Sequence, residues 1–193
     1  MITFDKINWI KNRTMSSNFQ KIETERFTLR QFTEDDLENV FKGLSHPDII
    51  KYYGISFNSL EATKEQITWF SDLEKNETGI WWAVCSKDGN VFYGAGGLND
   101  LDKDNKKAEI GFWLLPEFWG KGIMKEVMPL ICEYGFKELG LHRIEGFVES
   151  ENKNCQKGLA KLAFNLEGTM KDCEIKNGVF ISLDIYAMIN PEG

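Results

Sequence analysis

Residues 108–128, AEIGFWLLPEFWGKGIMKEVM, decide the fold of this chain. Residues 108–115 form an apolar, aromatic-rich run of strand length. Pro116 ends the run because proline has no N–H to donate to a strand ladder. From Ile123 onward, apolar residues recur every three or four positions, which indicates an amphipathic helix. The stretch therefore predicts a strand, a glycine turn and a helix.

The turn itself contains Gly120 and Gly122, and glycine lets a ligand approach the backbone closely. The first N–H groups of a helix have no partner within it, and the helix dipole makes them partly positive. The turn is therefore suited to a phosphate or pyrophosphate, with Lys121 as an added charge. It is not a Walker loop, because Ile123 follows Gly122, and Lys125 breaks the dinucleotide fingerprint. An ordinary turn between two elements is the alternative.

Length and composition bound the kind of protein. The chain has 193 residues, of which 42% are hydrophobic and six are Trp, which predicts one globular domain at residues 21–193 after an N-terminal extension at residues 1–20. No apolar run approaches the length of a membrane span, and polar residues interrupt any signal-peptide core. We therefore expect a cytoplasmic protein without a membrane partner.

The balance of charged residues limits which classes of binding partner are expected. The chain has 30 acidic and 23 basic residues and a net charge of −7, which argues against nucleic-acid binding and is compatible with a cationic amine. The four Cys and two His show no zinc-ligand spacing, so no metal is expected. Cys85 and Cys132 lie in apolar patterns and are interpreted as core residues. His46 is interpreted as a capping or turn residue.

The rest of the chain alternates between segments with the two-residue period of strands and segments with the 3.6-residue period of helices. Expected strands lie at residues 22–30, 80–86, 91–98, 142–149, 166–176 and 179–188, and expected helices at 33–44, 61–75 and 152–164. Glycines 94, 96 and 97 within a strand indicate a bulge or a close backbone approach. The order predicts an α/β (α+β) fold, a mixed and mostly antiparallel sheet flanked by helices.

The segment Glu117-Phe118-Trp119-Gly120-Lys121-Gly122 resembles the acetyl-CoA-binding signature of the GNAT N-acetyltransferases, Gln/Arg-x-x-Gly-x-Gly/Ala. Glu117 replaces the Gln or Arg, so its side chain should point away from the pyrophosphate. The longer form resembles the RimJ/RimL branch, which acetylates protein N-terminal amines, and the resemblance spans residues 22–189. It implies a GNAT-like sheet and acetyl-CoA as cosubstrate. The implied cosubstrate-binding residues are Trp113, Leu114, Leu115, Phe118, Trp119, Gly120, Lys121, Gly122, Ile123, Met124, Asn152 and Cys155.

Acetyl transfer to an amine requires a general base, an oxyanion donor and a general acid. The resemblance places the base at Glu174, in the penultimate strand, and Glu109 on the central strand is the rival. Glu174 could instead be an exposed strand carboxylate, and Glu109 a buried structural group. We expect the oxyanion donor to be a backbone N–H near Leu114, where the central strand splays. The pantetheine would pair with residues 113–115 like an added strand.

The branch's second motif, Asn-x-x-Ser, corresponds here to Asn152-Lys153-Asn154-Cys155. The resemblance implies that Asn152 binds the pantetheine, although Asn is also a common helix cap. Cys155 could donate a proton to the CoA sulfur, and a helix start would lower the pKa of its thiol. A small residue packed against the cosubstrate and a covalent acetyl-Cys are the alternatives.

The resemblance implies a protein N-terminal α-amine, as of a ribosomal protein, as the acceptor. A polyamine, amino acid or drug amine is the alternative acceptor, and a non-catalytic acyl-CoA-binding module is the alternative function. RimL-like proteins are often dimers, so a homodimer is also expected.

Overall fold

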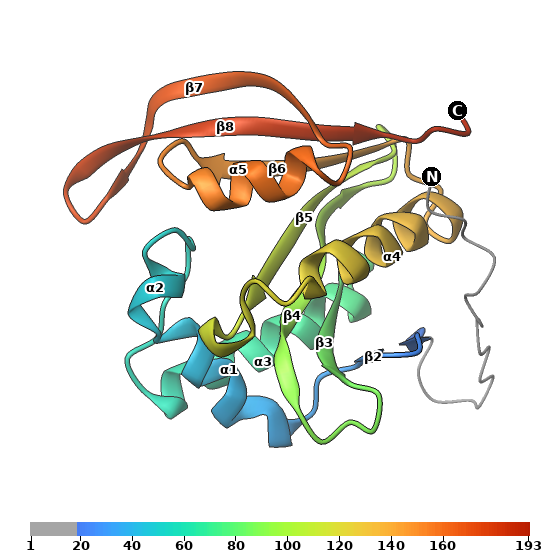
Figure 1. Cartoon of the computed structure of the whole chain (residues 1–193), viewed down its shortest axis with the longest axis vertical. Coiled ribbons are helices and arrows are strands. Elements are labelled where there is room, and N and C mark those ends of the chain that lie inside the picture. Colours follow the sequence, from blue (N-terminus) through green and yellow to red (C-terminus); the bar gives the residue numbers. More distant parts are fainter. Residues whose placement is uncertain (1–18) are drawn as a thin grey trace.

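The computed structural model describes residues 19–193, and nearly all of the predicted extension at residues 1–20 lies outside them. Within the described residues the strands form one eight-stranded sheet in the order β1-β2-β3-β4-β5-β6-β8-β7 (Figure 1). The strands are β1 (Ile22–Glu23), β2 (Phe27–Arg30), β3 (Ile80–Ser86), β4 (Phe92–Asp102), β5 (Lys107–Leu114), β6 (Arg143–Glu149), β7 (Asn165–Lys176) and β8 (Val179–Ile189).

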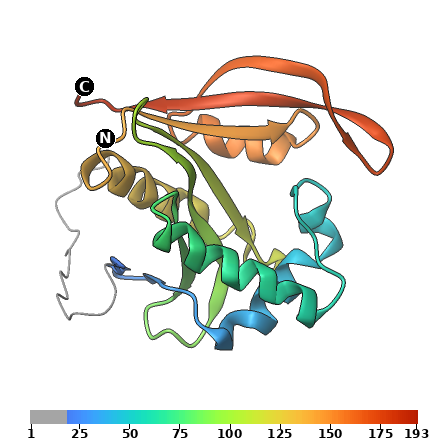
Figure 2. The same ribbon diagram turned by 180° about the vertical axis from the view of Figure 1, so that it is seen from behind.

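Helices cover both faces of the sheet. The helices are α1 (Leu37–Leu44), α2 (Pro47–Ile50), α3 (Leu60–Lys75), α4 (Ile123–Lys137) and α5 (Lys153–Ala160), with short 3-10 turns at Glu34–Asp36 and Pro116–Phe118. α4 and α5 lie on one face, and α1 and α3 lie on the other (Figures 1 and 2). Strand β5 serves both cores because its side chains alternate. Ile110 packs with the α4 side, and Trp113 packs with the α1 and α3 side.

One pair of neighbouring strands is parallel. All other pairs are antiparallel, whereas β5 and β6 run parallel and pair only at Lys107 with Arg143, Ala108 with Ile144, and Glu109 with Glu145. A parallel pair needs a crossover connection, which α4 supplies. Beyond these three pairs β5 and β6 separate (Figure 1). We call this point of separation the fork.

The predicted fold class is confirmed: the sheet is mixed, mostly antiparallel and flanked by helices. The single strand expected at residues 22–30 is wrong, because β1 and β2 are two strands that pair with each other. Thr24 causes the reversal. Its Oγ1 accepts hydrogen bonds from the N–H groups of Arg26 (3.2 Å) and Phe27 (2.8 Å), which closes a local turn.

The glycines of β4 mark a close backbone approach, as the sequence predicted. A Cβ on Gly94 would lie 2.7 Å from the Leu114 Cα and would also collide with the Trp113 carbonyl oxygen. These atoms belong to the backbone of β5, so they cannot rotate away. Any larger residue at position 94 must push β5 aside at the end that borders the fork.

We expect Gly94→Ala to lower the free energy of unfolding by about 1–3 kcal/mol, the usual cost of overpacking. The matched control is Gly168→Ala in β7, where a Cβ would meet no atom within 4 Å. Urea denaturation of both variants measures the difference. Equal midpoints for the two variants would contradict the close approach.

Candidate active site

The glycine turn after β5 has the geometry of an open anion site. Gly120 (φ 73°) and Gly122 (φ 77°) both have positive φ, and Gly122 is the N-cap of α4. A Cβ at either position would meet no protein atom within 4 Å. Internal packing therefore does not require glycine here. The backbone conformation does, and the space in front of it is free for a ligand.

Donors at the start of α4 face this space. The Glu126 N–H bonds to the Gly122 carbonyl (3.3 Å), so the N–H groups of residues 123–125 precede the helical ladder. The Lys121 ammonium lies 5.1 Å from the centre of the Phe118 ring, which keeps its charge beside the turn. These groups fit the pyrophosphate of a CoA molecule.

Glu117, which departs from the family signature, is turned toward α1. Its carboxylate pairs with the Lys42 ammonium (2.5 Å), and this hydrogen bond holds the pKa of Glu117 below its ordinary value. The expectation that this side chain points away from the pyrophosphate fits that contact. The negative charge is offset by Lys42 and leaves the anion site available.

The edge of β5 beyond the fork offers a backbone donor. The Leu115 N–H bonds to the Tyr93 carbonyl of β4 (2.9 Å). Because successive N–H groups of a strand alternate in direction, the Leu114 N–H points away from β4, to the side that β6 has left. The Trp119 indole N–H donates to the Leu114 carbonyl (2.8 Å) and fixes this corner. Trp113 and Leu115 instead direct their N–H groups at β4 and bury their side chains.

Four acidic residues interact electrostatically near the fork: Asp100, Glu109, Glu145 and Glu174. We call them the carboxylate cluster. Glu109 among them lies on the same face of β5 as Trp113, toward α1 and α3. Burial raises the pKa of Glu109 to about 7, and the negative charges of the other three act in the same direction. Tyr53 interacts electrostatically with the cluster: burial, and then the charge of Glu109, raise the pKa of its hydroxyl above the ordinary value. The two candidate bases, Glu109 and Glu174, therefore interact electrostatically although they are far apart in sequence. Glu109 is half-buried and Glu174 is exposed.

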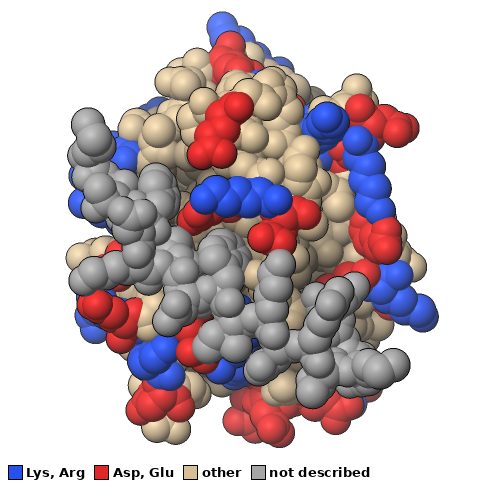
Figure 3. Space-filling model, turned by 90° about the vertical axis from the view of Figure 1, so that its right-hand side faces the viewer, with Lys and Arg blue, Asp and Glu red and all other residues tan. Residues whose placement is uncertain are grey.

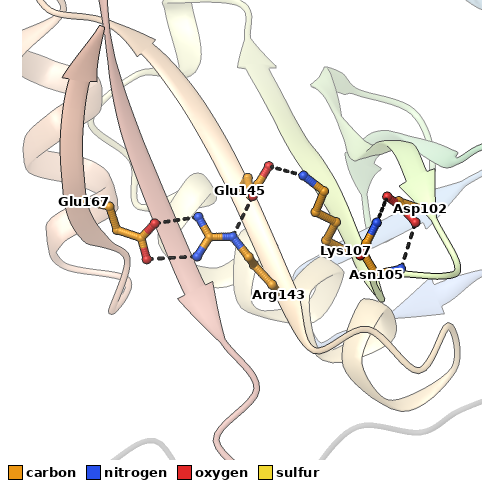
Figure 4. Close-up of polar contacts among 6 residues, drawn as sticks. All are labelled: Asp102, Asn105, Lys107, Arg143, Glu145 and Glu167. Carbon is orange, nitrogen blue, oxygen red and sulfur yellow. Dashed lines mark hydrogen bonds and ion pairs between the residues drawn. The ribbon is translucent and has the colours of Figure 1, made fainter.

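Ion pairs hold the base of the fork together (Figure 4). The Arg143 guanidinium donates to Glu145 (2.6 Å) and, through two nitrogens, to Glu167 (2.9 and 2.6 Å). The Lys107 ammonium lies 3.5 Å from the other oxygen of Glu145. These contacts connect β5, β6 and β7 where the parallel pairing begins, so the strands separate at a defined residue.

The start of α5 shows one confirmed and one wrong prediction. The Asn152 side chain accepts a hydrogen bond from the Cys155 N–H (3.1 Å), which confirms the cap. Its contact with pantetheine stays a prediction. The expected lowering of the Cys155 pKa is wrong: burial raises that pKa to about 11. The thiol packs against the core, and Asn152 already binds the nearby N–H, so desolvation outweighs the helix start.

The sequence analysis missed the buried carboxylate of Asp184 on β8. It accepts hydrogen bonds from Ser150 (2.8 Å), Gln156 (2.8 Å) and Thr169 (2.7 Å). These three donors fix α5 to β7 and β8, and so position Asn152 and Cys155. The only available signal was one Asp within the apolar run ISLDIY.

Three other residues singled out from the sequence have structural roles. His46 caps α2, because its Nδ1 accepts from the Asp48 N–H (3.2 Å), and Cys85 and Cys132 are buried as predicted.

In residues 19–193 no group of three or more His, Cys, Asp or Glu could hold a metal ion. No helix in that range is long and apolar enough to span a membrane. On the face shown in Figure 3, acidic and basic side chains are interspersed, without a basic stripe.

Residues 26–165 match the family model described as an acetyltransferase (GNAT) domain. The chain belongs to the GNAT acetyltransferase family. It is 32% identical over 174 residues to the Bacillus subtilis protein named Uncharacterized N-acetyltransferase YoaA, and the match covers 90% of this chain and 98% of that one.

Two solved structures share the fold. One is RimL, a ribosomal α-N-protein acetyltransferase in complex with coenzyme A (TM-score 0.77, 22% identity, 86% of this chain and 95% of that one). The other is a spermidine N-acetyltransferase from Vibrio cholerae with CoA and spermine (TM-score 0.76, 20% identity, 86% and 96%). The family and its relatives make this GNAT protein an acetyl-CoA-dependent N-acetyltransferase.

We expect Gly122→Ala to weaken acetyl-CoA binding by about tenfold or more, equivalent to about 1.4 kcal/mol, because a methyl group would enter the anion site. Gly140→Ala is the control. Gly140 also has positive φ (67°) and an open Cβ position, but it lies beyond the C-terminal end of α4. Both variants should lose about 1–2 kcal/mol of stability from backbone strain. Calorimetric titration separates the effects, and equal affinities in the two variants would contradict the site.

The raised pKa of Glu109 also predicts a pH dependence of stability. Between pH 4.5 and about 7 the folded GNAT protein holds a proton on Glu109 that the unfolded chain releases, so this residue's contribution to stability falls as pH rises. Glu109→Gln should remove that part of the decline. Urea denaturation across this window measures it, with Glu65→Gln on the exposed side of α3 as the control. Parallel curves for wild type and Glu109→Gln would contradict the burial.

Proposed function

We propose that this enzyme acetylates a protein N-terminal α-amine, as RimJ/RimL-like enzymes do, with Glu109 as the general base. The observation that carries the proposal is the half-buried carboxyl of Glu109 at the last β5–β6 pair, where burial raises its pKa to about 7. A base is most effective when its pKa lies near the working pH. The carboxyl group lies on β5, the strand that presents the Leu114 N–H to the cosubstrate.

The pKa of the acceptor amine sets the free-energy cost of removing its proton. A protein α-amine has a pKa of about 7.7–8.0, whereas an alkyl amine has a pKa of about 10.4. Taking the proton from an alkyl amine would therefore cost about 2.5 units more, or roughly 3.4 kcal/mol. This lower cost supports an α-amine as the acceptor. The negative charge of the carboxylate cluster also favours an amine acceptor, because it attracts the ammonium form.

The remaining roles follow from the geometry. When acetyl-CoA binds, it supplies an activated thioester whose carbonyl becomes negatively charged as the amine attacks. The Leu114 N–H would donate to that oxygen from the open edge of β5. Cys155, half-buried with a pKa of about 11, is neutral near pH 7 and could give a proton to the departing thiolate. Packing against the cosubstrate remains its alternative role, and Glu174 remains the alternative base.

A polyamine is the second candidate acceptor, and the carboxylate cluster favours it. Asp100 and Glu174, which interact with Glu109 and have no ion-pair partner among residues 19–193, would suit a substrate with several ammonium groups. The Vibrio cholerae neighbour is a spermidine N-acetyltransferase. The expected homodimer stays a prediction. Light scattering would measure it directly.

We expect Glu109→Gln to lower kcat by about 10²–10⁴-fold, the usual contribution of a general base. In the wild type, kcat/KM should rise with pH up to about 7, because Glu109 must be deprotonated. That dependence should vanish in Glu109→Gln and persist in Glu174→Gln. The acceptors are a hexapeptide with a free N-terminal serine, a matched peptide with a blocked terminus, and spermidine. Loss of the pH dependence in Glu174→Gln alone would make Glu174 the base, and turnover of spermidine alone would overturn the α-amine.

A further inference from the structure

The last residue of β7 makes a contact that the chemistry described so far does not use. The Lys176 ammonium donates to the Lys51 backbone carbonyl (2.7 Å), just after α2. It also pairs with the Glu149 carboxylate at the end of β6. The Lys176 side chain is 22% exposed and that of Glu149 is 13% exposed, so the ion pair is largely covered. One side chain thus connects three segments.

This contact crosses the open end of the fork. Figures 1 and 2 both show the tip of the β7–β8 hairpin near the segment that follows α2. Within residues 19–193, no other hydrogen bond or ion pair found in the structure joins the hairpin to residues 37–75. The link therefore depends on Lys176, which replaces the missing strand pairing at the far end of the fork.

Lys176 is close in sequence to the candidate base Glu174, and its partner Lys51 is close in sequence to Tyr53. Glu174 precedes it by two residues on β7, so both side chains share a face of the strand. Tyr53 follows Lys51 by two residues and adjoins Glu109. Anchoring Lys176 to Lys51 therefore fixes the separation of the two segments that carry Glu174 and Tyr53, both of which interact electrostatically with Glu109.

We propose that Lys176 is a positioning residue for the acceptor, a strap that holds the β7–β8 hairpin and the α2 segment together across the open end of the fork. This inference rests on the proposed function, because it takes the carboxylate cluster as the acceptor's position. The glycine turn that receives acetyl-CoA lies on a different part of the molecule, at the start of α4. Loss of the strap should therefore weaken acceptor use without weakening acetyl-CoA binding.

The test compares Lys176→Met with Lys171→Met. Lys171 lies on the same strand, and its exposed side chain makes no ion pair or hydrogen bond with the described residues. Lys176→Met should lower kcat/KM for the acceptor by about tenfold or more through misplacement, while the acetyl-CoA Kd stays unchanged. Lys176→Arg should restore most of the loss, and Glu149→Gln should reproduce part of it. The acceptors are the N-terminal serine hexapeptide and spermidine.

A second readout needs no acceptor. Amide hydrogen exchange should accelerate at residues 51–57 and 170–181 in Lys176→Met and remain at the wild-type rate in Lys171→Met. If the wild type acetylates neither amine, the proposed acceptors are wrong and exchange alone decides on the strap. Equal exchange in the two variants, or equal loss of acetyl-CoA and acceptor binding in Lys176→Met, would overturn the proposal.

Discussion

The three-residue parallel pairing of β5 with β6 is the constraint on which the site depends. Had the strands paired along their whole length, the Leu114 N–H would be consumed by the sheet and Glu109 would lie against a closed surface. The Arg143–Glu145–Lys107 contacts hold the base of the fork, so the strands separate at Glu109 rather than at a variable point. The unpaired edge of β5 is a ready partner for an extended ligand.

The fork also separates a region suited to anions from a region suited to cations. The proposed anion site at the start of α4 consists of backbone N–H groups and Lys121. Two carboxylates lie near it, and each has a basic partner: Glu117 pairs with Lys42, and Glu126 in the first turn of α4 pairs with Arg26. The carboxylate cluster near the fork suits a cation. A phosphate-bearing cosubstrate and an amine acceptor are thus attracted to different parts of the molecule, although acidic and basic side chains are mixed on the face in Figure 3. This local polarity explains how a protein of net charge −7 can bind CoA.

Local signals predicted much of the fold. The strand, glycine turn and helix at residues 108–128 were confirmed, as were the Asn177-Gly178 hairpin and the caps at His46 and Asn152. The errors arose where distant contacts or desolvation outweighed a local rule. Alternation at residues 22–30 concealed the turn at Thr24, and the helix-start argument for Cys155 ignored its burial.

The sequence by itself determined the GNAT family and predicted an anion site at the glycine turn, because both depend on residue types at short, fixed spacings. It predicted Glu174 as a base only through the family resemblance. Tertiary structure alone decided how those parts meet. Burial raises the pKa of Glu109, and the charges that add to this effect come from β4, β6 and β7. Lys176 binds a carbonyl 125 residues away. Such pairings depend on how the sheet twists and where β5 and β6 separate, and no local pattern encodes that separation.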